Sequence, residues 1–303
     1  MKLSALVVMT VTLAALLSVA LVIIRHMAGP RPSDPVDRAH LTGVSRPSPP
    51  IHRYSPSAHL ADLVDRYWIP VWSLAEPSTQ STLQHPVCLV VVSDTYARLY
   101  GVTRGRSSVT LEGEGYAVGT MLMPAAGRLL LGRPVAGLTD TWTDLAEVLP
   151  DGRLVDAVRA AMDAGPHDPG SHLRAIAHLE AWFTTFLPVD EQGLLVNRLV
   201  AWLREHPEVT RVGEMAAEVG LTERSLQRLV EQRLGISPKW LVQRRRLHDA
   251  VEALKAGATS LAQMAGDLGY TDQAHFTHDF RTVTGMTPGE YLRDQPSRAS
   301  TKS

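Results

Sequence analysis

Hydrogen-bonding side chains occupy one face of a predicted helix over residues 222–234, TERSLQRLVEQRL. The apolar residues recur at helical spacing and form the opposite face, at Leu226, Leu229 and Val230. The polar face carries Arg224, Gln227 and Arg228. Because arginine can grip O6 and N7 of a guanine and glutamine can pair with N6 and N7 of an adenine, this face could read base edges. A solvated helix face would explain any one of these side chains, so the surrounding pattern must decide.

The same pattern occurs twice in the C-terminal third of the chain. GLTERSLQRLVEQRLGISPKWLVQR starts at Gly220, and GYTDQAHFTHDFRTVTGMTPGEYLR starts at Gly269. In each copy a glycine ends one short helix, and a polar residue, Thr222 or Asp272, caps the next. A second glycine and a Ser-Pro or Thr-Pro pair then stop and restart the helix. This order predicts two helix-turn-helix units, with a plain helical repeat as the alternative.

Short breaks divide the C-terminal region into helices. They are expected near 193–205, 211–219, 222–234, 238–256, 260–268, 272–284 and 288–293. The long helix over 238–256 links the two units and sets their separation. Two reading helices must lie about 34 Å apart, one turn of B-DNA, to meet the same face of a duplex.

The second unit offers weaker base-reading chemistry than the first. Its candidate DNA contacts are Asp272, Gln273, His275, Thr277 and His278. A neutral histidine carries no fixed charge, so we expect mainly backbone contacts and weak base readout here. His275 and His278 could share a metal ion, but no cysteine lies nearby, and we expect no metal and no other cofactor. On the linking helix, Arg244 and Arg245 are predicted to contact phosphate or acidic neighbours, with a solvated basic run as the alternative.

These residues resemble the DNA-binding domain of the AraC/XylS family of bacterial transcription regulators. The second unit is similar to the family's signature region, and the likeness spans roughly 195–293. The resemblance implies two helix-turn-helix units joined by one long helix. It also places base-reading positions at Arg224, Gln227 and Arg228. Relatives commonly carry arginine where this chain has His278.

Two upstream segments resemble a sensor-type N-terminal domain found in some AraC-like regulators. They are RYSPSAHLADLVDRYW, from Arg53, and GTMLMPAAGRLLLGRPVAGLTDTWTDL, from Gly119. The chain has Leu122-Met123-Pro124-Ala125 where relatives often have a Phe-x-Pro-Gly turn. Such a domain implies effector sensing or dimerisation. Five aromatic residues could line a pocket or simply pack in a core: Trp68, Trp72, Tyr96, Tyr100 and Tyr116.

The expected fold class is α+β. A small antiparallel β-rich sensor or dimerisation domain is predicted over 51–190, and an all-α domain over 191–293. Strands are predicted at 86–93, 97–103, 108–113 and 116–123, where apolar runs alternate with turn residues. Helices are predicted at 59–67, 143–149, 151–164 and 171–187.

The two ends of the chain differ from the rest. Residues 1–26 form a hydrophobic segment, and its uncharged part, 3–24, would be long enough as a helix to cross a bilayer. Residues 27–50 are predicted to be a Pro-rich linker, and 294–303 a disordered tail. The flanking charges favour a cytoplasmic protein tethered to the inner face of the membrane by 3–24. A start codon wrongly assigned upstream of Met27 is the alternative.

Composition narrows the function classes. The chain has 303 residues, a formal charge of −1 and one cysteine. Cys88 lies in the apolar run VCLVVV, so a buried thiol is predicted rather than a nucleophile. Gly113, Gly115 and Gly119 lack the spacing of a nucleotide-binding loop, and we expect no enzymatic activity. Residues 199–296 hold 12 Lys plus Arg and 13 Asp plus Glu, so affinity for DNA must depend on where the charges lie.

The predicted principal partner is double-stranded DNA, at an operator or promoter. RNA polymerase, an unknown small-molecule effector and a second copy of the chain are further predicted partners. Two other functions stay open from the sequence: a membrane-tethered interaction protein that uses the helical repeat as a scaffold, and a DNA-repair enzyme fused to an AraC-like domain.

Overall fold

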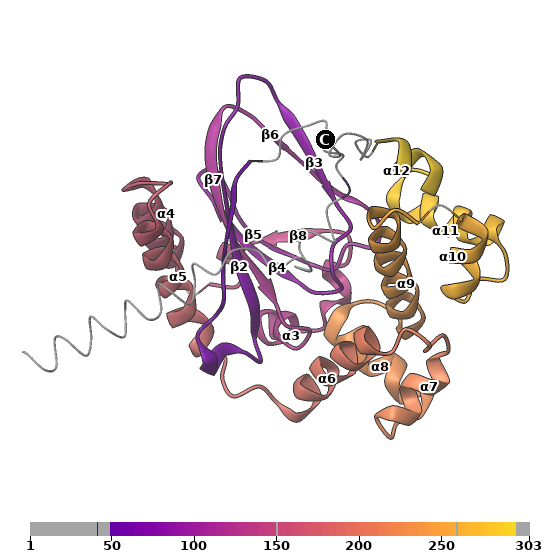
Figure 1. Cartoon of the computed structure of the whole chain (residues 1–303). Coiled ribbons are helices and arrows are strands. Elements are labelled where there is room, and N and C mark those ends of the chain that lie inside the picture. Colours follow the sequence, from indigo (N-terminus) through magenta and orange to yellow (C-terminus); the bar gives the residue numbers. More distant parts are fainter. Residues whose placement is uncertain (1–40, 42–48, 150, 259, 295–303) are drawn as a thin grey trace, which may run out of the picture.

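The computed structural model describes residue 41 and residues 49–149, 151–258 and 260–294. Its N-terminal half is built on an antiparallel sheet with the strand order β1-β2-β7-β4-β5-β8. The strands are β1 (Ile51–Tyr54), β2 (Val64–Ser73), β4 (Leu89–Ser93), β5 (Ala97–Tyr100), β7 (Glu114–Leu122) and β8 (Trp142–Asp144). A separate antiparallel ribbon consists of β3 (Ser78–Thr82) and β6 (Ser107–Leu111). Figure 1 shows this β-rich region beside a helical one, as the expected α+β class requires.

The central strand β4 is buried on both faces of the sheet. Val90 and Val92 belong to the main hydrophobic core, while Leu89 and Val91 pack into a smaller cluster on the other face. Such a doubly buried strand reads as a continuous apolar run, which explains the segment LVVVS. The sheet therefore has one face on the main core and one face toward a second apolar layer.

Four helices cover the core face of the sheet or extend from it: α3 (Ala126–Leu131), α4 (Arg153–Asp163), α5 (Pro169–Thr184) and α6 (Glu191–Glu205). Three short 3-10 turns connect elements: η1 (Ala58–Leu60), η2 (Val135–Leu138) and η3 (Leu145–Glu147). Polar contacts hold two of the helices, because Tyr54 Oη lies 2.6 Å from His172 Nδ1 on α5, and Tyr116 Oη donates to Asp163 on α4.

The C-terminal helices begin and end where the sequence predicts. They are α7 (Val212–Glu218), α8 (Glu223–Leu234), α9 (Pro238–Lys255), α10 (Leu261–Asp267), α11 (Gln273–Thr284) and α12 (Pro288–Asp294). The predicted glycine stops adopt positive φ: 64° at Gly220, 74° at Gly235, 72° at Gly269 and 79° at Gly285. In Figure 1, α7 and α8 lie near one end of α9, and α10 to α12 near the other.

The two helix-turn-helix units pack into different cores. The main core runs without a break from the sheet into the first unit, where it includes Leu226 and Val230. The second unit has its own cluster, and two residues from the N-terminal half, Leu41 and Leu83, are buried in it. The division at 190/191 stays a prediction, since the hydrophobic packing is continuous across it.

Several local predictions in the N-terminal half are wrong. Residues 59–67, predicted as a helix, contain η1 and then the start of β2, whose buried residues alternate with partly exposed ones. Residues 143–149, also predicted as a helix, are the end of β8 and the turn η3. Strands β1 and β3 were not predicted at all.

The predicted membrane segment, the linker up to residue 48 and the tail after 294 lie outside the described residues, except for Leu41. Among the residues that the structure does describe, no helix combines the length and the apolar character that a membrane span needs.

Candidate nucleic-acid interface

The polar face of α8 is open to solvent. Arg224, Gln227 and Arg228 are all exposed, while Leu226 and Val230 on the opposite face are fully buried. Thr222 caps the helix by accepting a hydrogen bond from the Ser225 amide at 3.2 Å. The three predicted base-reading side chains thus share one exposed face of a helix whose other side is anchored in the main core.

An ion pair between the buried Arg233 and the exposed Asp190 holds the back of α8. Arg233 donates to Asp190 at 2.7 Å, and only 4% of the Arg233 side chain is exposed. Asp190 also caps α6 by accepting from the Gly193 amide. The pKa of Asp190 is lowered by the hydrogen bonds from Arg233 and Gly193, which outweigh the raising effect of burial. This arrangement stiffens the helix that carries the candidate contacts.

The second unit repeats the geometry with different side chains. Asp272 accepts from the His275 amide at 2.8 Å and so caps α11, while Phe276 and Phe280 are fully buried. On the outer side, Gln273, His275 and His278 are exposed, and Thr277 is half-buried. These side chains are hydrogen-bonding groups without a cationic arginine, in keeping with the weaker readout expected of this unit.

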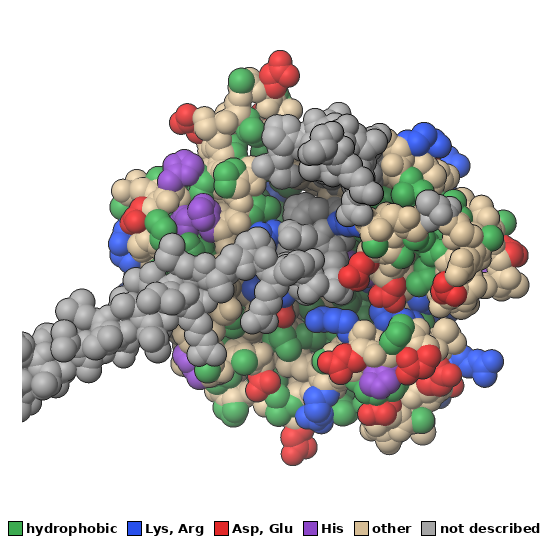
Figure 2. Space-filling model, viewed as in Figure 1, with side chains coloured by type: hydrophobic (Ala, Val, Ile, Leu, Met, Phe, Trp, Pro, Cys, Tyr) green, Lys and Arg blue, Asp and Glu red, His purple; other side chains and the backbone are tan. Residues whose placement is uncertain are grey.

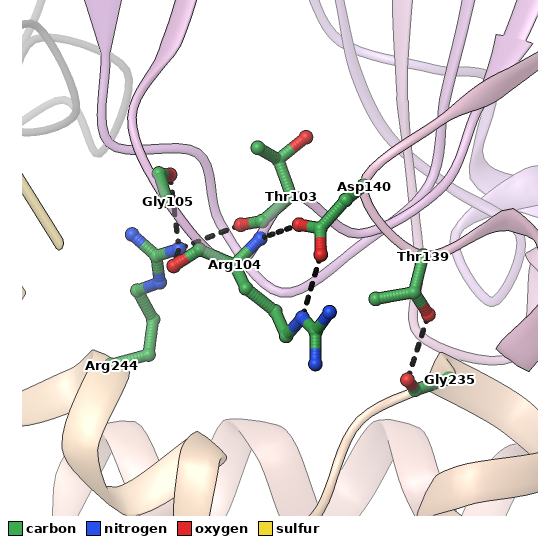
Figure 3. A network of polar contacts seen from close by, with 7 residues as sticks. All are labelled: Thr103, Arg104, Gly105, Thr139, Asp140, Gly235 and Arg244. Carbon is green, nitrogen blue, oxygen red and sulfur yellow. Dashed lines mark hydrogen bonds and ion pairs between the residues drawn. The ribbon is translucent and has the colours of Figure 1, made fainter.

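Arg244 does not lie where phosphate could reach it, so the prediction for this residue is corrected. Its side chain is 1% exposed. Its guanidinium donates to the backbone carbonyls of Thr103 at 2.6 Å and Arg104 at 2.8 Å, in the loop after β5 (Figure 3). Desolvation lowers the pKa of Arg244 to about 9, so the group stays charged at neutral pH, with its Nη2 bonded to backbone carbonyl oxygens.

Arg245 is likewise buried, at 8% exposure. It donates to the carbonyls of Pro207 and Val209 at 2.7 and 2.8 Å, and to Asp249 at 3.0 Å. The sequence predicted that Arg245 contacts either phosphate or an acidic neighbour. The structure shows the acidic neighbour, Asp249, and leaves the buried guanidinium out of reach of phosphate. The burial of Arg244 could have been predicted from the sequence. This residue lies three positions from both Leu241 and Leu247, and so shares the apolar face of the helix with them.

Two further contacts join α8 and α9 to the N-terminal half. Thr139 Oγ1 donates to the Gly235 carbonyl, at the end of α8, at 2.7 Å (Figure 3). The rings of His85 and His248, the latter on α9, stack with centroids 4.6 Å apart. Neither contact could be predicted from the sequence, because each joins residues far apart in the chain.

The charges on the helix-turn-helix units are mixed. Figure 2 shows acidic side chains interspersed with Lys and Arg over these units on the face in view. With Arg233, Arg244 and Arg245 buried, the cationic groups left for DNA on α8 are Arg224 and Arg228. Few phosphate contacts and a shallow dependence of affinity on salt are expected from this distribution.

Comparisons with known proteins agree with this geometry. Residues 215–294 match a family model described as a helix-turn-helix domain, and residues 52–144 match a domain of unknown function, DUF6597. The HTH-type transcriptional activator RhaS of Klebsiella pneumoniae is 32% identical over 140 residues, which cover 43% of this chain and 50% of the relative. RhaS of Escherichia fergusonii is 29% identical over 132 residues, covering 40% and 48%.

A solved AraC-type regulator from Chromobacterium violaceum is 25% identical, with a TM-score of 0.32, and covers 35% of this chain and 96% of that one. Residues 215–294 are a helix-turn-helix domain. This chain spans about half the length of the curated relatives it matches. The comparisons therefore identify the helix-turn-helix domain, and the activity of the whole chain is a proposal.

Proposed function

We propose that this chain is a transcriptional regulator that binds double-stranded DNA sequence-specifically through its two helix-turn-helix units. The observation that carries the proposal is the exposure of Arg224, Gln227 and Arg228 on one face of α8. In such units the second helix enters the major groove and presents its early residues to base edges. Arg224 and Arg228 would bind guanines, and Gln227 an adenine.

The second unit supports the proposal with a smaller share of the readout. Gln273 and His275 lie in the first turn of α11, with Thr277 and His278 one turn further on. Thr222 and Asp272 cap the two helices and are exposed, and the neutral Thr222 hydroxyl can donate to a phosphate of the DNA backbone. We assign α11 mainly to positioning and α8 mainly to base recognition.

The N-terminal half acts, in this proposal, as the sensor of a small-molecule effector. It is joined to α8 and α9 by the contacts of Thr139, Arg244 and His248, so a change in it can reach the DNA-binding helices. A regulator of this kind acts on RNA polymerase, and a second copy of the chain would double the recognised site. Both remain predicted partners.

An alternative role as a cysteine-dependent repair enzyme finds no support at Cys88. This thiol is 2% exposed, and burial raises its pKa to about 12. A thiol that stays protonated at neutral pH and has no access to solvent is a poor nucleophile.

A gel-shift assay on the DNA upstream of the chain's own operon tests the proposal. A discrete band that survives excess unrelated competitor DNA is expected, and it should weaken in Arg224→Ala and Arg228→Ala. Arg153→Ala is the matched control, because this arginine is 90% exposed and lies at the start of α4, away from both units. If competitor removes the band completely, or if all three variants behave alike, sequence-specific recognition by α8 is refuted.

A further inference from the structure

A large cavity lies between the second face of the main sheet and the β3–β6 ribbon. Its volume is about 580 Å³, within the range of pockets that hold small molecules. The sheet contributes Trp68, Trp72, Leu89, Val91 and Met121, and the ribbon contributes Gln80 and residues 107–111. Of the five aromatic residues named from the sequence, Tyr116 alone is absent from the lining, because its hydroxyl points to Asp163 on the core side.

The floor of this cavity is flat and aromatic for a local reason. Trp68 pairs with Gly119 across the β2–β7 ladder, and Trp72 pairs with Gly115. A Cβ atom on Gly119 would lie 2.2 Å from the Trp68 ring, and one on Gly115 would lie 2.6 Å from the Trp72 ring. The glycines therefore let both indoles lie against the sheet. This explains the glycine spacing that did not fit a nucleotide-binding loop.

The rim of the cavity exposes apolar surface. Among the residues that the structure describes, the large hydrophobic side chains that stand out as exposed are Val109, at 46%, and Trp142, at 41%, and both line this cavity. Exposed apolar surface around a pocket is unfavourable in water and marks a place where another molecule is buried.

One cation projects into this aromatic environment. The Arg98 guanidinium carbon lies 3.7 Å from the centroid of the Trp142 ring and 4.7 Å from that of Tyr96. Its Nε is buried and donates to no described residue. No carboxylate is found among the residues that line the cavity. A guanidinium that lines a cavity without a carboxylate can take an anionic ligand group as its partner, through charge-assisted hydrogen bonds.

We propose that this cavity binds a planar aromatic molecule bearing a single acidic group, with the anion on Arg98 and the ring against Trp68, Trp72 and Trp142. Only the role of the bound molecule rests on the proposed function, because a ligand of this cavity is an effector if the chain is a regulator. The aromatic floor favours a flat ring over an aliphatic chain, and the single guanidinium favours one negative charge.

The cavity is also connected to the DNA-binding helices. His85 lines it and stacks on His248 of α9. Two residues earlier in the chain, Leu83 is buried in the core of the second helix-turn-helix unit. A ligand that shifts the segment 83–85 therefore shifts a wall of that unit as well.

Isothermal titration calorimetry of the full chain with 2-naphthoate tests the proposal. Two comparison ligands separate its parts: 2-naphthylmethanol keeps the ring without the charge, and cyclohexanecarboxylate keeps the charge without the aromatic ring. Because a hydrogen bond to a charged group contributes about 1.5–3 kcal/mol, we expect 2-naphthoate to bind roughly 10- to 100-fold more tightly than the alcohol. Cyclohexanecarboxylate should also bind more weakly than 2-naphthoate.

Variants assign the charge to its residue. Arg98→Gln should remove the preference for the acid over the alcohol, Arg98→Lys should restore part of it, and Arg153→Gln, a distant exposed arginine, should change nothing. The proposal is overturned if the wild-type chain binds none of the three ligands saturably, or if it binds 2-naphthoate and 2-naphthylmethanol with equal affinity. Both results come from the wild-type chain, so they do not depend on whether a variant folds. A gel shift of the ligand-free protein distinguishes this failure from failure of DNA binding.

Discussion

The imidazole rings of His85 and His248 lie parallel, with their centroids 4.6 Å apart and an angle of 4° between their planes. His85 belongs to the wall of the N-terminal cavity, and His248 to the helix that joins the two helix-turn-helix units. Both ring nitrogens of His248 are shielded from solvent. Burial, followed by the neighbouring His85 and Arg244, lowers the pKa of His248 well below its usual value, so the His248 ring is uncharged at neutral pH.

This stack predicts a loss of stability in mild acid. The unfolded chain binds a proton at His248 below about pH 6.5, whereas the folded chain does not until the pH reaches its much lower folded pKa. The free energy of unfolding should therefore fall as the pH drops below 6.5, with a contribution from this residue of roughly 1 kcal/mol at pH 5.5. Urea unfolding at several pH values measures it.

His248→Phe isolates the effect, because it keeps a ring against His85 and removes the titration. His52 and His172, whose pKa values burial also lowers, contribute equally to both proteins. Above pH 7 the free energies of unfolding of the wild-type chain and of His248→Phe should differ by a constant. Below pH 6 the wild-type chain should lose stability relative to the variant, so that the two curves converge or cross. Curves that stay parallel down to pH 5 would contradict a neutral, buried His248.

Arg228→Ala should change sequence preference as well as affinity. Since a bidentate arginine–guanine contact is lost, the expected cost is about 1–3 kcal/mol on the preferred site, with relaxed preference at one base pair. Binding to a set of single-base operator variants measures this. An equal loss on every sequence would instead make Arg228 a phosphate contact.

Arg244→Gln should destabilise the fold without altering how DNA affinity depends on salt. The variant loses charged hydrogen bonds to the carbonyls of Thr103 and Arg104, for an expected cost of about 2 kcal/mol in urea unfolding. A lost phosphate contact lowers the slope of log Kd against log salt by about 1, and here we expect no such change. A slope reduced in Arg244→Gln but not in Arg153→Gln would return Arg244 to the DNA interface.

The helix-turn-helix units could be predicted from the sequence because their signals are local. Glycine stops at Gly220 and Gly269 and caps at Thr222 and Asp272 act within one or two turns of their own helices. Strand β2 could not be recognised in the same way. A shift of register between Val64 and Arg66 breaks the alternation of buried and exposed residues at the start of this strand, and Pro70 lies within it.

The role of Arg244 and the ligand cavity depend on contacts between distant segments. Arg244 is buried by a loop about 140 residues earlier in the chain, and no period in the sequence reports where that loop lies. Similarly, Trp142 and Arg98 meet because β8 pairs with β5 at the edge of the sheet. Sequence patterns identified the aromatic residues but could not show which side of the sheet each one faces.

Gly235 and Gly220 form a matched pair for testing the contact between α8 and the N-terminal half. Both have positive φ, 74° and 64°, so alanine at either position is strained by roughly 1–2 kcal/mol. The two glycines differ in the atoms that surround them. A Cβ on Gly235 would lie 2.4 Å from Thr139 Oγ1 and 3.0 Å from the backbone of Ala136, whereas a Cβ on Gly220 meets nothing within 4 Å.

Gly235→Ala should therefore destabilise the chain by at least about 1 kcal/mol more than Gly220→Ala, because it adds a steric clash to the backbone strain. Urea unfolding gives both values. In the Gly235→Ala background, Thr139→Ala removes one clashing atom and should recover part of the additional loss of stability. In the Gly220→Ala background, Thr139→Ala should only add the cost of the lost hydrogen bond to the Gly235 carbonyl. Equal losses for the two glycine variants would mean that α8 is not held against η2 in solution, and that the N-terminal half does not position the reading helix.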